Sequence, residues 1–329
     1  MKYQNLGATD IRVSQVAFGC WGLGGGGVWS DMTLDIQTVA NLLDAAADLG
    51  INYLDTAPVY GIGTSEYILG QALKGRRDKF IVQTKCSLNW RGEGGEFEYE
   101  RDGKTVTKDH RASAIRKDVE ESLARMEMDC FDSMVVHRMS SVVPVEETMG
   151  ELNKLVDEGL IRAIMISNSK PADLDEYSEY GLVAGVQEKF SLLTDEQRVY
   201  FDTCAKHDAT FQTYGSLEEG FLTGLAFFER TGFGAGDIRS RPRFNTEPVR
   251  SAVMDMLRSF EPLTEKYGCS ITNLVQAWTL AQYSKLSLLT GFRRVETMAD
   301  TCKAFDIVLA PEDIAFMTAA AQKVKDLEN

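Results

Sequence analysis

The sequence predicts an α/β fold, a single (β/α)8 TIM barrel that carries a small N-terminal hairpin. Short apolar runs alternate with amphipathic helical patterns along the whole chain, which indicates a parallel sheet, and eight such runs are the number that closes a barrel. The candidate strands are 16–19, 51–55, 80–85, 131–137, 161–167, 184–187, 209–214 and 286–291. A doubly wound open sheet of two domains is the rival. No Pro/Gly/Ser-rich linker or composition shift divides the chain, so we expect one domain over residues 1–329.

Helical patterns fill the segments between the strands. TVANLLDAAADLG stops at Gly50 and VEETMGELNKLVDEG at Gly159, and glycine is a favoured residue just past a helix end. SAIRKDVEESLARM repeats the pattern between the third and fourth strands. The last helix, PEDIAFMTAAAQKVKD, begins with proline and acidic residues and ends in lysines, which matches the helix dipole.

Three further segments are predicted by their position. MKYQNL and IRVS, joined by GATD, are expected to form a hairpin that caps the end of the barrel opposite to the active face. Residues 86–110 and 215–245 follow the third and seventh strands and are too long for turns. Because both follow a strand, we expect both as long loops on the carboxyl face, where barrel active sites lie.

Composition narrows the function. The net charge of −14 and the pI near 4.8 argue against nucleic acid or an anionic membrane as partner. No apolar run approaches the roughly 18 residues that span a bilayer, and the N-terminus lacks the apolar core of a signal peptide. Six cysteines show no CxxC pair and no metal-ligand spacing, which predicts reduced thiols in a cytoplasmic protein and no metal site.

A glycine-rich run after the first strand imitates a dinucleotide-binding fingerprint. Gly22, Gly24 and Gly27 satisfy GxGxxG. That fingerprint needs a helix that opens on the last glycine and faces the pyrophosphate. VWSDM intervenes here, and the helix is expected to begin near Thr33. We therefore interpret the run as a loop at the edge of the active site.

Four polar residues stand at, or just beyond, the ends of successive predicted strands: Asp55, Tyr60, Lys85 and His137. The carboxyl ends of parallel neighbours meet at one end of a barrel, so we expect these side chains to gather there. A carboxylate, a phenol, an ammonium and an imidazole together can transfer a proton at neutral pH. Each alone has a structural reading, as a helix cap, a packed ring or a core histidine. The four in this order favour an active site.

The stretches around these residues resemble the aldo-keto reductases of the bacterial type, a family that in turn resembles the potassium-channel β-subunits. The matching stretches are DTAPVYGIGTSE (55–66), Thr84-Lys85, His137, GLIRAIMISNS (159–169), GVQEKFSLL (185–193), YGSLEEGFLTG (214–224) and GFRRVETMADT (291–301). The resemblance runs in order from about residue 3 to about residue 320. It implies a (β/α)8 barrel that uses NADP(H), or NAD(H), without a Rossmann domain, in agreement with the independent fold prediction.

The resemblance implies a carbonyl reductase, or the reverse alcohol dehydrogenase. Hydride transfer leaves an alkoxide, so a proton must be delivered, and Tyr60 is the proposed acid. A neighbouring Lys85 ammonium would favour the phenolate and lower the pKa of Tyr60 from its usual value near 10. Asp55 would hold Lys85 in place, and His137 would orient the carbonyl by a hydrogen bond.

Family positions also imply cofactor contacts. Ser167, Asn168 and Gln187 would bind the nicotinamide carboxamide, and Tyr214 would stack on the ring. Gly215, Ser216 and Leu217 would follow the pyrophosphate, and Arg293 and Arg294 would hold an adenosine 2′-phosphate. The remaining implied cofactor contacts are Trp21, Gly291, Thr297, Asp300 and Thr301.

The chain departs from the family pattern at several positions. Glu218 and Glu219 place negative charge beside the expected pyrophosphate path, which weakens binding unless they point outward. Phe190-Ser191 replaces the usual Tyr-Asn, and Thr301 stands where many members carry Asn. Cys20 and Cys86 flank the predicted site and are interpreted as inert packing residues.

The substrate is expected to be a small carbonyl compound or alcohol, polar or sugar-like. Trp21 and Trp90 are candidate substrate contacts. Arg138 follows His137 where many members carry Trp, and it either contacts a polar substrate or pairs with an acid on the rim. Two other functions stay open: a redox-neutral lyase or epimerase, through a Lys85 Schiff base or retained NAD(P), and a non-catalytic cofactor-sensing subunit.

Overall fold

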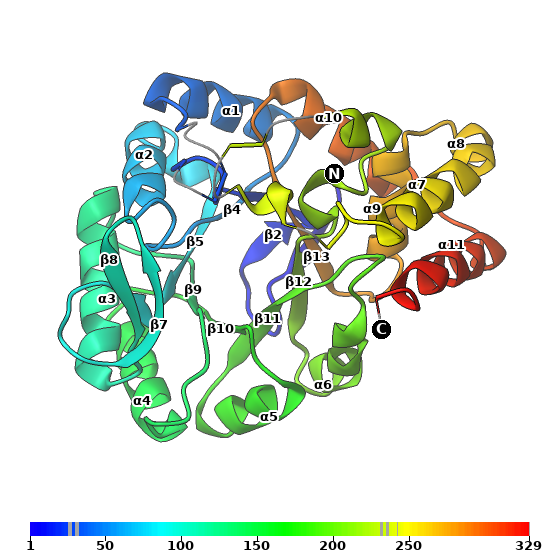
Figure 1. Cartoon of the computed structure of the whole chain (residues 1–329). Helices are drawn as coiled ribbons and strands as arrows, with labels where there is room; N and C mark the ends of the chain where they lie inside the picture. The colour runs from blue at the N-terminus through cyan, green and yellow to red at the C-terminus, as the bar shows by residue number, and fades with distance from the viewer. Residues whose placement is uncertain (26–27, 30–32, 231–232, 235–236, 242, 329) are drawn as a thin grey trace.

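The computed structural model describes residues 1–329 except 26–27, 30–32, 231–232, 235–236, 242 and 329. Eight parallel strands close into a barrel in the order in which they occur along the chain, and helices surround them (Figure 1). The barrel strands are β3 (Val16–Gly19), β4 (Tyr53–Asp55), β5 (Ile81–Cys86), β9 (Ser133–Val136), β10 (Ile164–Ser167), β11 (Val183–Lys189), β12 (Thr210–Tyr214) and β13 (Leu286–Gly291). The barrel prediction is confirmed, and each predicted strand overlaps one of these eight.

The helices follow the predicted patterns. They are α1 (Ile36–Asp48), α2 (Thr64–Ala72), α3 (Ala112–Met126), α4 (Val145–Asp157), α5 (Pro171–Tyr180), α6 (Tyr200–Lys206), α7 (Val249–Ser259), α8 (Glu261–Tyr267), α9 (Ile271–Leu280), α10 (Val295–Lys303) and α11 (Pro311–Lys325). The expected start of α1 near Thr33 is wrong, because the Asp35 carboxylate caps the helix and accepts from the Thr38 N–H at 2.9 Å. Gly27 of the GxGxxG pattern lies outside the described residues. None of the described helices is long and apolar enough to cross a membrane.

The N-terminal hairpin, β1 (Tyr3–Asn5) and β2 (Arg12–Ser14), covers the amino end of the barrel as expected. Gly7, in its turn, has a φ of +56°, and a Cβ there would lie 2.1 Å from the Ala184 carbonyl oxygen. The Gly7 N–H donates to Thr210 Oγ1 at 2.8 Å, at the start of β12. Only glycine permits this close approach, so Gly7 fixes the hairpin against the barrel.

The expectation of a long loop after the third barrel strand is wrong in part. Residues 88–108 form a three-stranded antiparallel sheet in the order β6 (Leu88–Asn89), β8 (Lys104–Lys108), β7 (Glu96–Arg101). Asp102 and Gly103 join β7 to β8, both with positive φ, and Asp-Gly is a strong signal for a two-residue hairpin turn. The segment after β12 is closer to the expectation, since its described part contains three short 3-10 turns: η3 (Glu218–Gly220), η4 (Leu225–Glu229) and η5 (Ile238–Ser240).

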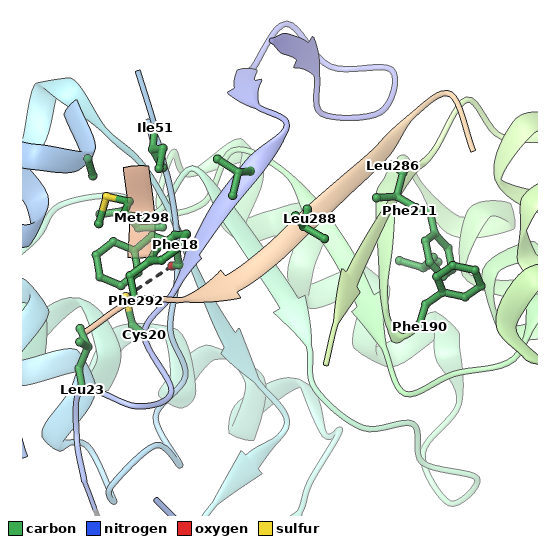
Figure 2. Packing of buried hydrophobic residues seen from close by; sticks show 14 of the residues in the cluster. Phe18, Cys20, Leu23, Ile51, Phe190, Phe211, Leu286, Leu288, Phe292 and Met298 are labelled. Atoms are coloured by element: carbon green, nitrogen blue, oxygen red, sulfur yellow. Dashed lines mark hydrogen bonds between the residues drawn. The ribbon is translucent and has the colours of Figure 1, made fainter. Parts of the chain in front are cut away.

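The barrel interior changes character along its axis. At the amino end it is apolar, where Leu6, Ile11 and Val13 of the hairpin pack with Ala17, Tyr53, Val135, Ala163, Met165 and Ala184. Outside the barrel, aromatic side chains fill the layer between strands and helices, including Phe18 against Phe292 at 5.4 Å and Phe190 against Phe211 at 5.8 Å between ring centroids (Figure 2). The carboxyl half of the interior is polar instead, which directs attention to that end.

Candidate active site

A fully buried ion pair lies at the carboxyl end of the barrel. Lys85 on β5 donates from Nζ to Asp55 Oδ1 on β4 at 2.6 Å and to the Thr56 carbonyl at 2.8 Å. Burial lowers the pKa of Lys85, and the Asp55 carboxylate opposes that effect. Removing one member of such a pair leaves an uncompensated buried charge, so Asp55 and Lys85 stabilise one another.

A layer of three glutamine side chains supports the Asp55 carboxylate from within the barrel. Gln83 and Gln187 donate to Asp55 Oδ1 at 2.6 and 2.8 Å, and the same two amides donate to Gln212 Oε1 at 2.8 and 2.6 Å. The Tyr53 hydroxyl in turn donates to Gln83 Oε1. Sequence reasoning missed Gln83 and Gln212, although polar residues inside apolar barrel strands are a usable signal.

Tyr60 lies above the ion pair. Its ring centroid is 5.0 Å from Lys85 Nζ, and its ring packs against the apolar side chains of Ala57, Val59, Leu88 and Val106. Burial, followed by the nearby Asp55 charge, raises the pKa of Tyr60 well above 10. The expectation that Lys85 lowers this pKa is therefore wrong for this site, because the cost of burying a phenolate is the larger effect. Tyr60 is held protonated at neutral pH.

His137 completes the predicted set. Its ring meets that of Tyr60 edge to face, with centroids 6.0 Å apart. Burial is the largest cause that holds the pKa of His137 well below 6.5, and the positive charges of Lys85, Arg138 and Arg101 add to it. The imidazole is therefore neutral at neutral pH. Its Nδ1 is buried without a hydrogen-bond partner among the described residues, which suits a ring that receives a ligand.

A second group of predicted residues lies on the opposite strands. Asn168, just beyond β10, has a φ of +52° and donates from Nδ2 to the His137 carbonyl at 2.9 Å, while its Oδ1 accepts from the Tyr214 hydroxyl at 2.7 Å. Ser167 Oγ donates to the Gln187 carbonyl at 2.7 Å. Because their donors are used within this network, these side chains offer oxygen atoms to a ligand. A carboxamide NH2 fits such a set as donor.

The two glutamates beside the expected pyrophosphate path, Glu218 and Glu219, differ in burial and in ion pairing. Glu218 is fully buried and turned towards Ser191 and Thr194, which donate to it at 2.5 and 2.6 Å, and towards Lys189 at 2.7 Å. Its charge is therefore neutralised inside the protein. Glu219 is 3.7 Å from Lys189 and stays partly exposed. Gly215, with a φ of +67°, and buried Ser216 form the turn that leads to this pair.

The segment 291–301 runs from the end of β13 through a short loop into α10. Arg294 is its N-cap residue and is exposed, and Arg293 is half-buried. Burial lowers the pKa of Arg293, and so does the charge of Arg239. Two neighbouring guanidinium groups at a helix N-terminus fit an anion. Asp300 and Thr301 instead lie against α9, where the Asn273 amide donates to the Asp300 carbonyl at 2.8 Å. Thr297 Oγ1 donates to the Arg294 carbonyl, and Gly291 ends β13.

The three candidate substrate contacts differ in position. Trp21 lies beside Tyr60, with ring centroids 5.9 Å apart. Trp90 packs in the apolar cluster under the β6–β8–β7 sheet, below the Arg125 guanidinium at 5.6 Å. Arg138 Nε is 3.3 Å from Glu98 of β7, which is the rim salt bridge that the sequence left open as an alternative. The Arg138 carbonyl is held by His110 Nε2 at 2.6 Å, a contact that sequence reasoning missed.

The cysteines agree with the packing interpretation. All six are free thiols. Cys20 and Cys86 are fully buried, and burial raises the pKa of both thiols above the ordinary value. Neither is poised as a thiolate at neutral pH.

The predicted residues divide between two halves of the barrel. One half holds the four candidate catalytic residues, which lie at or just beyond the carboxyl ends of β4, β5 and β9: Asp55, Tyr60, Lys85 and His137. The cofactor candidates after residue 160 lie on or after β10, β11, β12 and β13. The halves meet where Gln187 bonds Asp55 and where Asn168 bonds the His137 carbonyl. Such an arrangement can present a cofactor from one side to a proton donor on the other.

Comparisons with known proteins agree with this geometry. The model of the Aldo/keto reductase family matches residues 15–322. The chain is 34% identical to the NADH-specific methylglyoxal reductase of Escherichia coli strain K12, over 99% of this chain and 100% of that protein. It is 29% identical to a probable voltage-gated potassium channel subunit beta of rice, over 98% of this chain and 97% of that protein. It superposes with a TM-score of 0.83 on a glycerol dehydrogenase of Gluconobacter oxydans, at 30% identity, covering 98% of this chain and 94% of that one.

Proposed function

Because this chain belongs to the Aldo/keto reductase family, we propose that it is a nicotinamide-dependent oxidoreductase that interconverts a carbonyl compound and an alcohol. The observation that carries the proposal is the buried Lys85–Asp55 pair beneath Tyr60, with neutral His137 at the edge of the phenol ring. Relatives that are named for methylglyoxal reduction and glycerol dehydrogenation support the same reaction class. The direct test is cofactor oxidation, followed by absorbance, with aldehydes, ketoses and polyols as substrates.

In this mechanism a bound reduced nicotinamide supplies the hydride. Tyr60 donates its hydroxyl proton to the carbonyl oxygen as the alkoxide forms. The Lys85 ammonium, 5.0 Å from the ring centroid, stabilises the phenolate left behind, and Asp55 holds Lys85 in position. Neutral His137 donates a hydrogen bond that orients the carbonyl. Trp21 lies beside the Tyr60 ring, with ring centroids 5.9 Å apart.

Three alternative functions differ from the reductase in what they require of the protein and in what an assay would detect. A Schiff base would require the Lys85 amine to leave Asp55 and Thr56, which it contacts at 2.6 and 2.8 Å. A redox-neutral enzyme would convert substrate without net oxidation of added cofactor. A non-catalytic sensing subunit would bind cofactor and convert no substrate; the rice relative is named as a probable channel subunit. The absorbance assay separates all three from the reductase.

For the cofactor we propose NADP(H), with NAD(H) as the alternative, through Arg293 and Arg294. The E. coli relative is named NADH-specific, so measuring whether this chain prefers NADPH or NADH tests the proposal directly. We expect the double variant Arg293→Ala/Arg294→Ala to lose about 1.5–3 kcal/mol in NADPH affinity and little in NADH affinity, because hydrogen bonds to charged groups have this strength.

Titration calorimetry with both cofactors measures the effect. Arg258→Ala is the control, since Arg258 pairs with Asp255 on the exposed face of α7. Equal losses of affinity for NADPH and NADH, or no loss for either, would show that the two arginines do not bind the 2′-phosphate.

The pKa directions predict a broad pH plateau. His137 is neutral above its lowered pKa, and Tyr60 is protonated below its raised pKa. We therefore expect kcat/KM for reduction to be constant from about pH 6.5 to about pH 10, the ordinary values of the two groups.

The lowered pKa of His137 also predicts that the free energy of unfolding falls as pH drops below about 6.5, because the unfolded chain then binds a proton that the folded chain does not bind.

Rate measurements across that range, and thermal melts of the protein and of His137→Asn, test both statements. The wild-type protein should lose more stability than the variant between pH 7 and pH 5. An inflection near pH 6.5 in the rate would contradict a neutral His137.

Arg138 is proposed to contact a polar, oxygen-rich substrate from the rim. Under this proposal Arg138→Leu raises KM for polyol-like substrates and spares plain alkyl aldehydes. If the Glu98 salt bridge is its only role, all substrates decline together and the melting temperature falls. Glu98→Gln serves as the matched control, because it removes the pair and keeps the arginine.

We further propose one domain over residues 1–329 and a cytoplasmic location, the latter from the six free thiols.

A further inference from the structure

Arg101 lies beside the candidate active site and has no acidic partner among the residues that the structure describes. It ends strand β7, and its guanidinium carbon lies 4.6 Å from the centre of the Tyr99 ring. The two residues are two positions apart on one strand, so their side chains share a face, and both are partly buried. Within the described part of the chain the Arg101 side chain makes no ion pair and no hydrogen bond.

The course of β7 brings this face towards the candidate catalytic residues. Near its start, Glu96 accepts from Ser140, and Glu98 then pairs with Arg138, so the strand begins beside the loop after β9. A bulge between Phe97 and Tyr99 bends the strand there, and such bulges re-aim side chains. Tyr99 next packs in the apolar cluster that holds Tyr60. Figure 1 shows β7 beside the ring of barrel strands, on the β5 and β9 side.

Two other cations beside the site have acidic partners. Lys85 is paired with Asp55, and Arg138 with Glu98. Arg101 adds a positive charge that makes no ion pair within the described part of the chain, although Glu100 and Asp102 flank it in the sequence, and this charge helps to lower the pKa of His137. The chain as a whole carries a net charge of −14, so the positive charge of Arg101 is opposite in sign to the net charge of the protein. A local positive field of this kind attracts an anion.

We propose that Arg101, braced on the Tyr99 ring, binds an anionic group, a carboxylate or a phosphate, on the carbonyl substrate. The inference rests on the proposed reductase function and specifies its substrate class. A guanidinium stacked on an aromatic ring keeps its fork of donors in one plane, which suits either oxyanion. The proposed cofactor contacts after residue 160 lie on or after β10–β13, in the other half of the barrel, so the anion is not the cofactor's own phosphate.

The test compares matched carbonyl pairs with one added anionic group. The carboxylate arm uses 4-oxobutanoate against butanal, and the phosphate arm uses glyceraldehyde 3-phosphate against glyceraldehyde. Wild-type protein should show the higher kcat/KM for the charged member of at least one pair. Arg101→Leu should lower that value roughly 10- to 150-fold, the range for hydrogen bonds to a charged group, and leave the uncharged member unchanged.

Two further variants make the result specific. Lys104→Leu removes an exposed positive charge directly across the hairpin from Arg101. This variant should leave kcat/KM unchanged for both members of each substrate pair. Arg101→Lys should recover only part of the preference, since an ammonium lacks the planar fork. The loss should appear in KM rather than kcat and should shrink at high salt.

A binding measurement separates this inference from the proposed function. Unreactive butanoate and methyl phosphate are titrated onto the cofactor-saturated protein and onto Arg101→Leu. If no carbonyl is reduced but wild-type protein alone binds one of these anions, the reductase function fails and the anion site stands. If butanal and glyceraldehyde are reduced without preference for the charged partners, or Arg101→Leu lowers both members equally, the anion site is overturned and the function stands.

Discussion

Replacing Tyr60 by phenylalanine is expected to reduce carbonyl reduction by about 100-fold or more, while the fold and cofactor binding survive. A positioned general acid contributes on the order of 100- to 10,000-fold, and the substitution removes only the hydroxyl. The ring itself keeps its packing against Ala57, Val59, Leu88 and Val106 and its contact with Trp21. Steady-state kinetics, with cofactor affinity and a thermal melt measured on the same preparation, tests this expectation.

The matched control is Tyr99→Phe, which removes a second hydroxyl from the same cluster. That variant should keep most of its turnover, because Tyr99 is not predicted to transfer the proton. Full turnover by Tyr60→Phe would mean that the proton comes from another group and that the mechanism is wrong.

Replacing Lys85 by methionine is expected to damage turnover as severely and to destabilise the protein as well. The substitution leaves the Asp55 carboxylate buried without its cation, and breaking a buried pair in this way costs about 3–5 kcal/mol. Residual activity should keep the pH plateau, with an alkaline limit no lower than that of the wild-type protein, because no ammonium remains to favour the phenolate. Chemical denaturation and pH–rate profiles provide the two readouts.

A double variant separates the chemical role of Lys85 from its structural role. Lys85→Met/Asp55→Asn removes both charges together, so most of the lost stability should return. Activity should not return with it. If activity recovers in step with stability, Lys85 supports the fold alone, and the proposed stabilisation of the Tyr60 phenolate is incorrect.

Much of the fold was predictable because its determinants are local. Eight apolar runs separated by helical patterns predict the barrel. The strands predicted over 51–55 and 80–85 lie within two residues of the observed bounds, Tyr53–Asp55 and Ile81–Cys86. The β7–β8 hairpin was overlooked even though Asp102-Gly103 marks its turn. Its strands are rich in charged residues, so they lack the apolar pattern by which the barrel strands were recognised.

The predicted direction of the Tyr60 pKa was wrong for a different reason. Sequence places Lys85 near Tyr60, and a neighbouring cation lowers the pKa of a phenol. The structure shows the ring largely enclosed by neighbouring side chains and close to the charge of Asp55, and these two effects raise the pKa. Burial depends on every element packed around a group, and it cannot be inferred from the identity of one neighbour.

The sequence by itself determined the barrel, the residues gathered at its carboxyl end and the family to which the chain belongs, because strand order in a parallel barrel follows chain order. Only the tertiary structure decided which charges are balanced. It turned Glu218 inward to Lys189, paired Arg138 with Glu98, and left Arg101 over Tyr99 without an acidic partner in the described chain. The physical reason is distance: electrostatic and desolvation energies depend on a few ångströms between side chains from separate elements, and no local pattern in a sequence specifies those separations.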